Sequence, residues 1–156
     1  MKLQVAADWV EVPLKAFVGE ARAEIAVLLH PTGQVLGQFG FARSVDVVTA
    51  CALGAAIHAS SGELGKQLDG KPFTVMHYAG PHKQIFLAPV PIDGGTLLLL
   101  TVFDEESSLG LVQIFFKEFC AALAKVAPQW KGAEAALATD FESELNKNLA
   151  AMFGRG

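Results

Sequence analysis

Residues 44–68 constrain the fold more than any other part of the chain, because they predict a long helix that is apolar on two opposite sides. Ser44 is a candidate N-cap, and no Asp, Glu, Lys or Arg occurs from residue 47 to residue 62. Placing successive residues about 100° apart separates two faces. Large side chains share one face, which suits packing on a sheet. They are Leu53, Ile57, Leu64 and Leu68.

Small or short side chains share the opposite face of this predicted helix. They are Val48, Cys51, Ala52, Ala55 and Ala59, with His58 beside them. Small side chains let a second helix approach closely. A helix that is apolar on both sides is covered on both sides, so we expect the small-residue face to form a dimer or partner interface.

The composition favours one folded, self-associating domain. The chain has 156 residues, of which 52% are apolar and 18% charged, and this balance excludes a disordered protein. The net charge is -4 and the 12 basic residues are spread singly, so we expect no nucleic-acid partner. The mean hydropathy of +0.38 is high for a small soluble protein and indicates that some apolar surface is hidden in an oligomer.

The sequence predicts neither export nor membrane insertion. No apolar run approaches the roughly 18 residues that cross a bilayer. The first eight residues lack the apolar core of a secretory signal. Cys51 and Cys120 both lie in apolar helical patterns, which is typical of buried, reduced thiols. We therefore expect a cytoplasmic protein.

The order of predicted elements indicates an α+β fold. Helices are expected at residues 13–23, 44–68, 107–126 and 133–153. Strands are expected at residues 24–30, 34–40, 73–78, 84–91 and 96–103. Pro13 is placed in the first turn of its helix, where proline is tolerated. Hairpins alternating with helices predict an antiparallel sheet with helices on both faces.

Strand patterns predict positions within the sheet. Four consecutive leucines at residues 97–100 show no alternation, so that strand should be central and covered on both faces. Gly37 and Gly40 weaken residues 34–40 and indicate an edge strand. Residues 73–78 alternate and should lie nearer an edge.

The last two helices are amphipathic. Ser107 or Ser108 caps the first of them, whose predicted buried stripe is Val112, Phe115, Phe116, Phe119, Leu123 and Val126. We divide the chain into a domain at residues 1–127 and an appended amphipathic helix at residues 133–153. The appended helix carries an apolar docking ridge at four-residue steps: Leu137, Phe141, Leu145, Leu149 and Phe153.

No set of residues in the sequence has the pattern of an active site, so we predict a non-enzymatic protein without metal or cofactor. Residues 65–72 match most of a phosphate loop, but Pro72 replaces its hydroxyl residue and a helix precedes it, which favours a helix end and a turn. Four histidines, at positions 30, 58, 77 and 82, lack metal-ligand spacing within any element. The three arginines, Arg22, Arg43 and Arg155, are interpreted as solvated surface charge rather than as a finger for a nucleotide.

Four segments together resemble the Roadblock family, named for a dynein light chain, and in particular its bacterial MglB-like members. The first hairpin is similar to AVLLHPTGQVL at residues 26–36, and the long middle helix to the alanine-rich residues 49–68. The last strand resembles TLLLLTV at residues 96–102, and the opening of the last helix resembles SSLGLV at residues 107–112. The match runs from about residue 14 to residue 126.

The resemblance implies a five-stranded antiparallel sheet with a long helix on one face and two helices on the other. It also implies a homodimer, or a heterodimer with a related Roadblock chain, joined through the middle helices and third strands. Bacterial members bind small Ras-like GTPases and stimulate their hydrolysis without an arginine finger, and the corresponding surface here is residues 43–61, beginning at Arg43. We therefore expect a dimeric regulator or scaffold for a small Ras-like GTPase. A structural subunit of a larger assembly and a small-molecule-sensing domain remain the alternatives.

Overall fold

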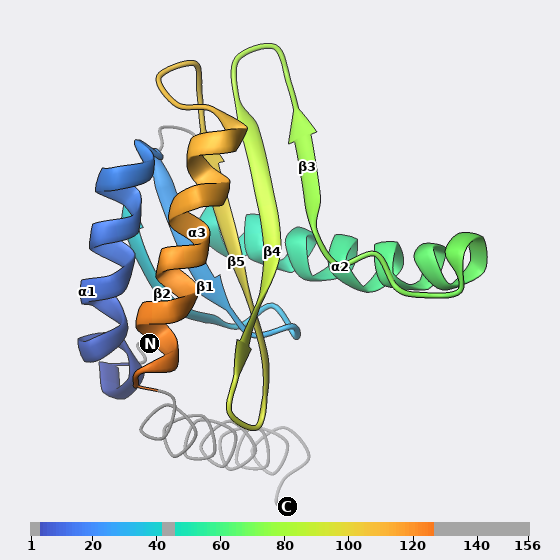
Figure 1. The fold of residues 1–156 in the computed structure, drawn as a ribbon, viewed down its shortest axis with the longest axis horizontal. Helices are drawn as coiled ribbons and strands as arrows, with labels where there is room; N and C mark the ends of the chain where they lie inside the picture. Colours follow the sequence, from blue (N-terminus) through green and yellow to red (C-terminus); the bar gives the residue numbers. More distant parts are fainter. Residues whose placement is uncertain (1–3, 42–45, 127–156) are drawn as a thin grey trace, which may run out of the picture.

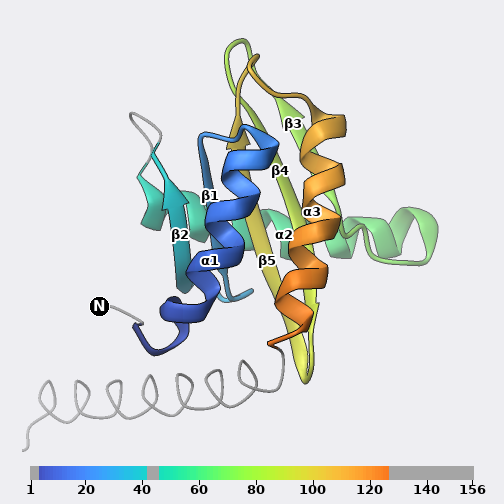
Figure 2. The ribbon, with the colours of Figure 1, turned by 60° about the vertical axis from the view of Figure 1, so that its left-hand side comes forward.

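The protein is a five-stranded antiparallel sheet with helices on both faces in a computed structural model that describes residues 4–41 and 46–126. The elements in chain order are α1 (Gln4–Ala21), β1 (Ile25–Leu29), β2 (Val35–Gly40), α2 (Val47–Asp69), β3 (Met76–Ala79), β4 (Gln84–Ile92), β5 (Gly95–Phe103) and α3 (Leu109–Ala124). Helices α1 and α3 lie side by side on one face, and α2 runs across the strands on the other (Figures 1 and 2). This confirms the predicted α+β architecture. The appended helix at residues 133–153, its docking ridge and Arg43 lie outside the described residues.

The strand order is β2-β1-β5-β4-β3, so the leucine-rich β5 is the middle strand, as predicted. Leu97 and Leu99 pack toward α1 and α3, whereas Leu98 and Leu100 pack toward α2. A strand buried on both faces has no polar side to alternate with its apolar side. β2 and β3 form the two edges, which confirms both edge predictions.

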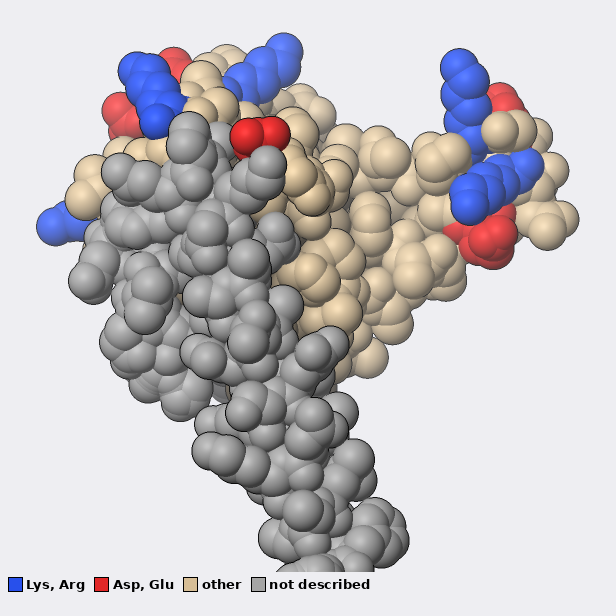
Figure 3. Space-filling model, turned by 90° about the horizontal axis from the view of Figure 1, so that it is seen from below, with Lys and Arg blue, Asp and Glu red and all other residues tan. Residues whose placement is uncertain are grey.

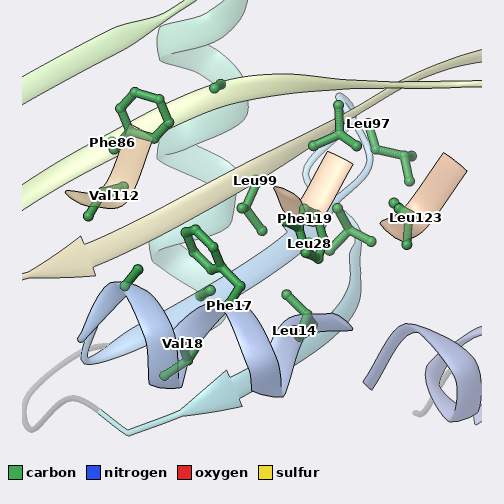
Figure 4. Packing of buried hydrophobic residues seen from close by; sticks show 14 of the residues in the cluster. Leu14, Phe17, Val18, Leu28, Phe86, Leu97, Leu99, Val112, Phe119 and Leu123 are labelled. Carbon is green, nitrogen blue, oxygen red and sulfur yellow. The ribbon is translucent and has the colours of Figure 1, made fainter. Parts of the chain in front are cut away.

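The larger part of the core lies between the sheet and the α1–α3 pair (Figure 4). Phe17 of α1 and Phe119 of α3 bring their ring centroids within 5.8 Å, and Phe86 of β4 meets Phe116 edge-on at 5.4 Å. Each buried aromatic of this kind stabilises the fold by roughly 1.5–3 kcal/mol. The predicted stripe of α3 is confirmed: Val112, Phe119 and Leu123 are buried, and Phe115, Phe116 and Val126 are partly buried against the same cluster.

Helix α1 begins at Gln4, so the prediction that Pro13 opens it is wrong, because Pro13 lies inside the helix. An interior proline removes one backbone hydrogen bond and costs about 3 kcal/mol. The apolar stripe of α1 continues through that position, with Val10, Leu14 and Phe17 all buried. Burial of this continuous stripe outweighs the local cost of the proline.

Side-chain caps fix where α2 and α3 begin. Asp46 rather than Ser44 caps α2: its carboxylate accepts hydrogen bonds from the Thr49 hydroxyl at 2.8 Å and the Thr49 backbone N–H at 3.3 Å, which lowers the pKa of Asp46. Ser108 caps α3 by accepting from the backbone N–H of Leu111 at 3.2 Å. Helix α2 ends at Gly70 in the left-handed conformation, which confirms that residues 65–72 are a helix end and a turn.

Candidate interaction surface

The sheet-facing side of α2 is built from small residues. Cys51 and Ala55 are buried, with exposed fractions of 0% and 7%, among Leu87, Leu98 and Leu100. A Cβ added to the buried Gly54 would lie 3.9 Å from Cδ1 of Leu87, so the helix backbone itself rests on the sheet. The prediction that Cys51 and Ala55 face a second helix is therefore wrong in this protomer, because both contact their own sheet.

The opposite, outer side of α2 carries its large residues. Leu53, Leu64 and Leu68 have exposed fractions of 59%, 52% and 71%, so the prediction that they pack on the sheet is wrong. Only Ile57 of that set is partly buried against the sheet cluster. The physical reason is distance: small side chains let the helix approach the sheet closely, whereas a row of leucines would hold it away.

Most of α2 has no cover in the described part of the chain. Only Cys51, Gly54, Ala55 and Gly65 are buried among its 23 residues. The C-terminal half of the helix extends beyond the β3 edge of the sheet (Figures 1 and 2). Viewed from below, this projection is uncharged until Lys, Asp and Glu side chains appear at its tip (Figure 3). An uncharged helix surface of this extent is unusual in water, so the outer side of α2 is the candidate interaction surface.

The segment that returns from α2 to the sheet adds to this apolar surface. Phe73, Val75 and Tyr78 have exposed fractions of 37%, 51% and 47%. Phe73 and Val75 lead into β3, which contains Tyr78. β3 pairs with β4 on one side and with no strand of the described residues on the other. The edge strand was predictable from the sequence, but its exposed apolar side chains were missed, and their signal was the alternation at residues 73–78.

The remaining predicted interface residues are divided by their exposure. Ala52, Ala59 and Val48 are exposed, and His58 is partly buried. Their role in an interface stays a prediction. The predicted small-residue face is therefore divided: Cys51 and Ala55 contact the sheet, whereas its other members are exposed to solvent.

The described residues contain no group of three or more His, Cys, Asp or Glu side chains that could hold a metal ion. His77 makes a 2.8 Å hydrogen bond with Gln84 and stacks on Phe103, and His30 makes a 3.0 Å hydrogen bond with Thr32. These histidines have local structural partners. Burial raises the pKa of the Cys51 and Cys120 thiols to about 11, so both are protonated and weakly nucleophilic near neutral pH.

By length and composition alone, α2 could cross a membrane, contrary to the expectation that no segment approaches such a span. The helix is this hydrophobic because alanines, valines, a leucine and an isoleucine share a stretch, residues 47–62, that contains no Asp, Glu, Lys or Arg. The prediction of no membrane insertion therefore stays a prediction.

The fold has counterparts among solved structures, although no family model and no curated protein matches the sequence. The gliding protein mglB of Thermus thermophilus is 27% identical, with a TM-score of 0.66 over 77% of this chain and 89% of that one. A structure described as MglB with tetrameric arrangement is 25% identical, with a TM-score of 0.70 over 80% of this chain and 91% of that one. The Roadblock/LC7 domain from Streptomyces avermitilis is 17% identical and has a TM-score of 0.62 over 80% and 97%, which shows the shared fold.

The strand order of the sheet and the exposed helix α2 across one of its faces, together with these similarities, define a Roadblock-type regulator domain. Within that class the chain is similar to bacterial MglB structures, which agrees with the resemblance in its sequence.

Proposed function

We propose that this protein is a non-enzymatic, dimeric regulator or scaffold that binds a small Ras-like GTPase in the cytoplasm. The observation that carries the proposal is the outer side of α2, where large apolar side chains face solvent in a domain similar to MglB. Exposing Leu53, Leu64 and Leu68 to water is unfavourable by roughly 25 cal/mol per Å² of apolar area. A partner that covers them recovers that free energy.

Self-association at the β3 edge accounts for the length of α2. Two copies that joined their β3 edges about a two-fold axis would continue the sheet from one protomer into the other. The half of α2 that projects beyond its own sheet would then lie over the sheet of the second copy (Figure 1). Phe73, Val75 and Tyr78 flank that edge and would be covered at the same time.

The GTPase would contact the N-terminal half of the paired α2 helices, at residues 43–61. This part of α2 offers shape and apolar contact rather than a catalytic group, since residues 47–62 contain no Asp, Glu, Lys or Arg. Its effect on hydrolysis would be conformational: differential contact with the switch loops in their two nucleotide states shifts them toward the hydrolysis-competent arrangement.

Binding and hydrolysis measured on the same samples test the proposal. The full chain is mixed with a candidate GTPase loaded with GDP or a non-hydrolysable GTP analogue, and complex formation is measured by light scattering. We expect binding to prefer one nucleotide state and hydrolysis to accelerate. Leu53→Arg should abolish both effects, whereas Val12→Arg, at a 72% exposed position of α1 on the other face of the sheet, should leave them intact.

Two results would contradict parts of the proposal separately. Equal binding in both nucleotide states without a rate change would favour a structural subunit of a larger assembly. If the protein dimerises but binds no GTPase, the dimer part of the proposal stands and the regulatory part is wrong.

A further inference from the structure

The β2 edge of the sheet, opposite the β3 edge, is open to a further strand. In the described part of the chain β2 pairs with β1 alone, and Figure 2 shows it on the side of the sheet away from β3. Residues 34–41 contain no charged residue and no proline, the usual features that keep an exposed edge from pairing. The register shift opposite Leu28 and Leu29 lies near the start of β2 and leaves residues 37–40 in regular register.

The backbone of Gln38 faces this open side. Phe41 donates its N–H to the Glu24 carbonyl at 2.9 Å, and successive residues of a strand direct their backbone groups to opposite sides. Phe39 therefore bonds toward β1, whereas the N–H and C=O groups of Gln38 and Gly40 point away from it. Gln38 is exposed, so an antiparallel copy of β2 would exchange two backbone hydrogen bonds with it.

Helix α1 borders the same edge, and its neighbours fix which of its flanks faces outward. A Cβ on Gly37 of β2 would lie 3.3 Å from Cγ1 of Val10 and 3.5 Å from Cδ1 of Leu14. Phe17 instead packs against Phe119 of α3. The direction around α1 from Phe17 through Val10 to Leu14 therefore leads from α3 toward the β2 edge.

Two opposite charges lie on the flank of α1 over that edge. Continuing around the helix in the same direction, at about 100° per residue, reaches Glu11 and then Lys15. Both side chains are exposed. When two copies of a helix meet antiparallel about a two-fold axis, each residue contact occurs twice. Glu11 of each copy would then face Lys15 of the other, so this flank is electrostatically self-complementary.

We propose that the β2 edge is a second interface between copies of this chain, in which two β2 strands pair antiparallel about a two-fold axis at Gln38. Strands pair about 4.8 Å apart, so the two α1 helices would lie at about the 10 Å spacing of packed helices. Because Gly37 adjoins Val10 and Leu14, the axis at Gln38 passes α1 level with residues 11–15. The same axis thus joins the strands and pairs the opposite charges.

The two α2 helices do not collide in this arrangement. A Cβ on Gly33, in the turn before β2, would lie 3.5 Å from Cα of Ala52, so α2 crosses the β1–β2 hairpin near its turn. In an antiparallel pair the two turns lie at opposite ends of the joined strands. The α2 helices would therefore lie at opposite ends as well, away from the axis at Gln38.

Disulfide trapping of the full chain tests the position of the axis. A residue on the axis meets its own copy with Cα atoms about 5.5 Å apart, within the range of a disulfide. We expect Gln38→Cys to form a disulfide-linked dimer under mild oxidation. Gln113→Cys, at an exposed position of α3, is the matched control and should remain unlinked. Cys51 and Cys120 are present in both variants and so do not distinguish them.

Charge reversal tests the pairing of the α1 helices. Lys15→Glu turns two symmetric attractions into repulsions and should weaken association at this edge about tenfold. Adding Glu11→Lys to Lys15→Glu exchanges the charges and should restore it. Lys117→Glu, at an exposed position of α3, should have no effect. Sedimentation velocity across a dilution series measures all four proteins.

The same measurement separates this interface from the proposed β3-edge dimer. If both edges pair, the wild type forms species larger than a dimer at high concentration, and Lys15→Glu stops at a dimer. If the β3-edge proposal is wrong, the wild type stops at a dimer that Lys15→Glu dissociates. Either result supports the β2 interface.

Three results would overturn the proposal: no linked dimer in folded Gln38→Cys, unchanged association of Lys15→Glu, or a double variant that does not recover. Hydrogen exchange of the wild type decides if the cysteine variant does not fold. The amides of Gln38 and Gly40 should exchange more slowly at high protein concentration than at low. Equal exchange at both concentrations would contradict strand pairing at this edge.

Discussion

A Cβ placed on Gly65 would lie only 2.3 Å from the backbone nitrogen of Phe73, so α2 and the return segment touch backbone to backbone. No other residue fits at position 65 without moving that segment. Phe73 also precedes the β3 edge and is 37% exposed there. This one contact therefore helps to position the β3 edge that we propose for self-association.

Gly65→Ala should displace the return segment and destabilise the fold by about 1–3 kcal/mol, the usual cost of overpacking. Urea unfolding followed by circular dichroism measures the change. The matched control is Gly62→Ala, one turn earlier in the same helix, where a Cβ would make an ordinary 3.7 Å contact with Pro72. The control should be neutral or slightly stabilising, because alanine is the better helix former. Equal effects of the two variants would contradict the close approach at Gly65.

Leu64→Arg should weaken self-association, because it places a charge on an apolar side chain of α2 that we propose to be covered by a second copy. A central interface position of this kind typically costs about 2–4 kcal/mol of binding free energy. Light scattering across a dilution series measures the shift toward protomer. Ile114→Arg on α3 is the control, since Ile114 is 57% exposed and Leu64 is 52% exposed. Dissociation by the control and not by Leu64→Arg would place the interface on the α1–α3 face.

Ala55→Arg should unfold the protein rather than only separate two copies. Ala55 lies against the sheet, so the arginine would bury an unpaired charge at a cost of about 3 kcal/mol or more. Its neighbour Ala56 is exposed, and Ala56→Arg should leave the free energy of unfolding nearly unchanged. Chemical denaturation of both variants measures this difference. A folded, monomeric Ala55→Arg variant would restore the original assignment of Ala55 to the interface.

Stability should fall as pH rises from about 9 to about 11, because burial raises the pKa of Cys51 and Cys120 from 9.0 to about 11. Over that range the unfolded chain loses its thiol protons while the folded chain keeps them, so proton release favours unfolding. Below pH 9 this contribution is fully present. Urea midpoints across the range should decline less steeply in Cys51→Ala than in the wild type. Identical slopes would show that Cys51 does not titrate as a buried thiol.

Several features of the fold follow from residue patterns alone. The four leucines at residues 97–100 lack any polar alternation, and only a strand covered on both faces tolerates that pattern, so β5 could be placed in the middle of the sheet. The buried apolar stripe of α3 could be predicted because the polar residues of this helix occupy the other side, which leaves one possible buried face. Gly37 and Gly40 likewise indicated the edge position of β2.

The orientation of α2 was decided only by the tertiary structure. Periodicity separates the two faces of a helix, but when both faces are apolar it does not say which one meets the sheet. Cys51, Gly54 and Ala55 face the sheet, because their small size lets the helix backbone pack closely on Leu87 and Leu100. That choice turns Leu53, Leu64 and Leu68 toward solvent. The sequence thus determined the elements and an α2 that is apolar on two sides, whereas three-dimensional packing determined which of those sides is left exposed.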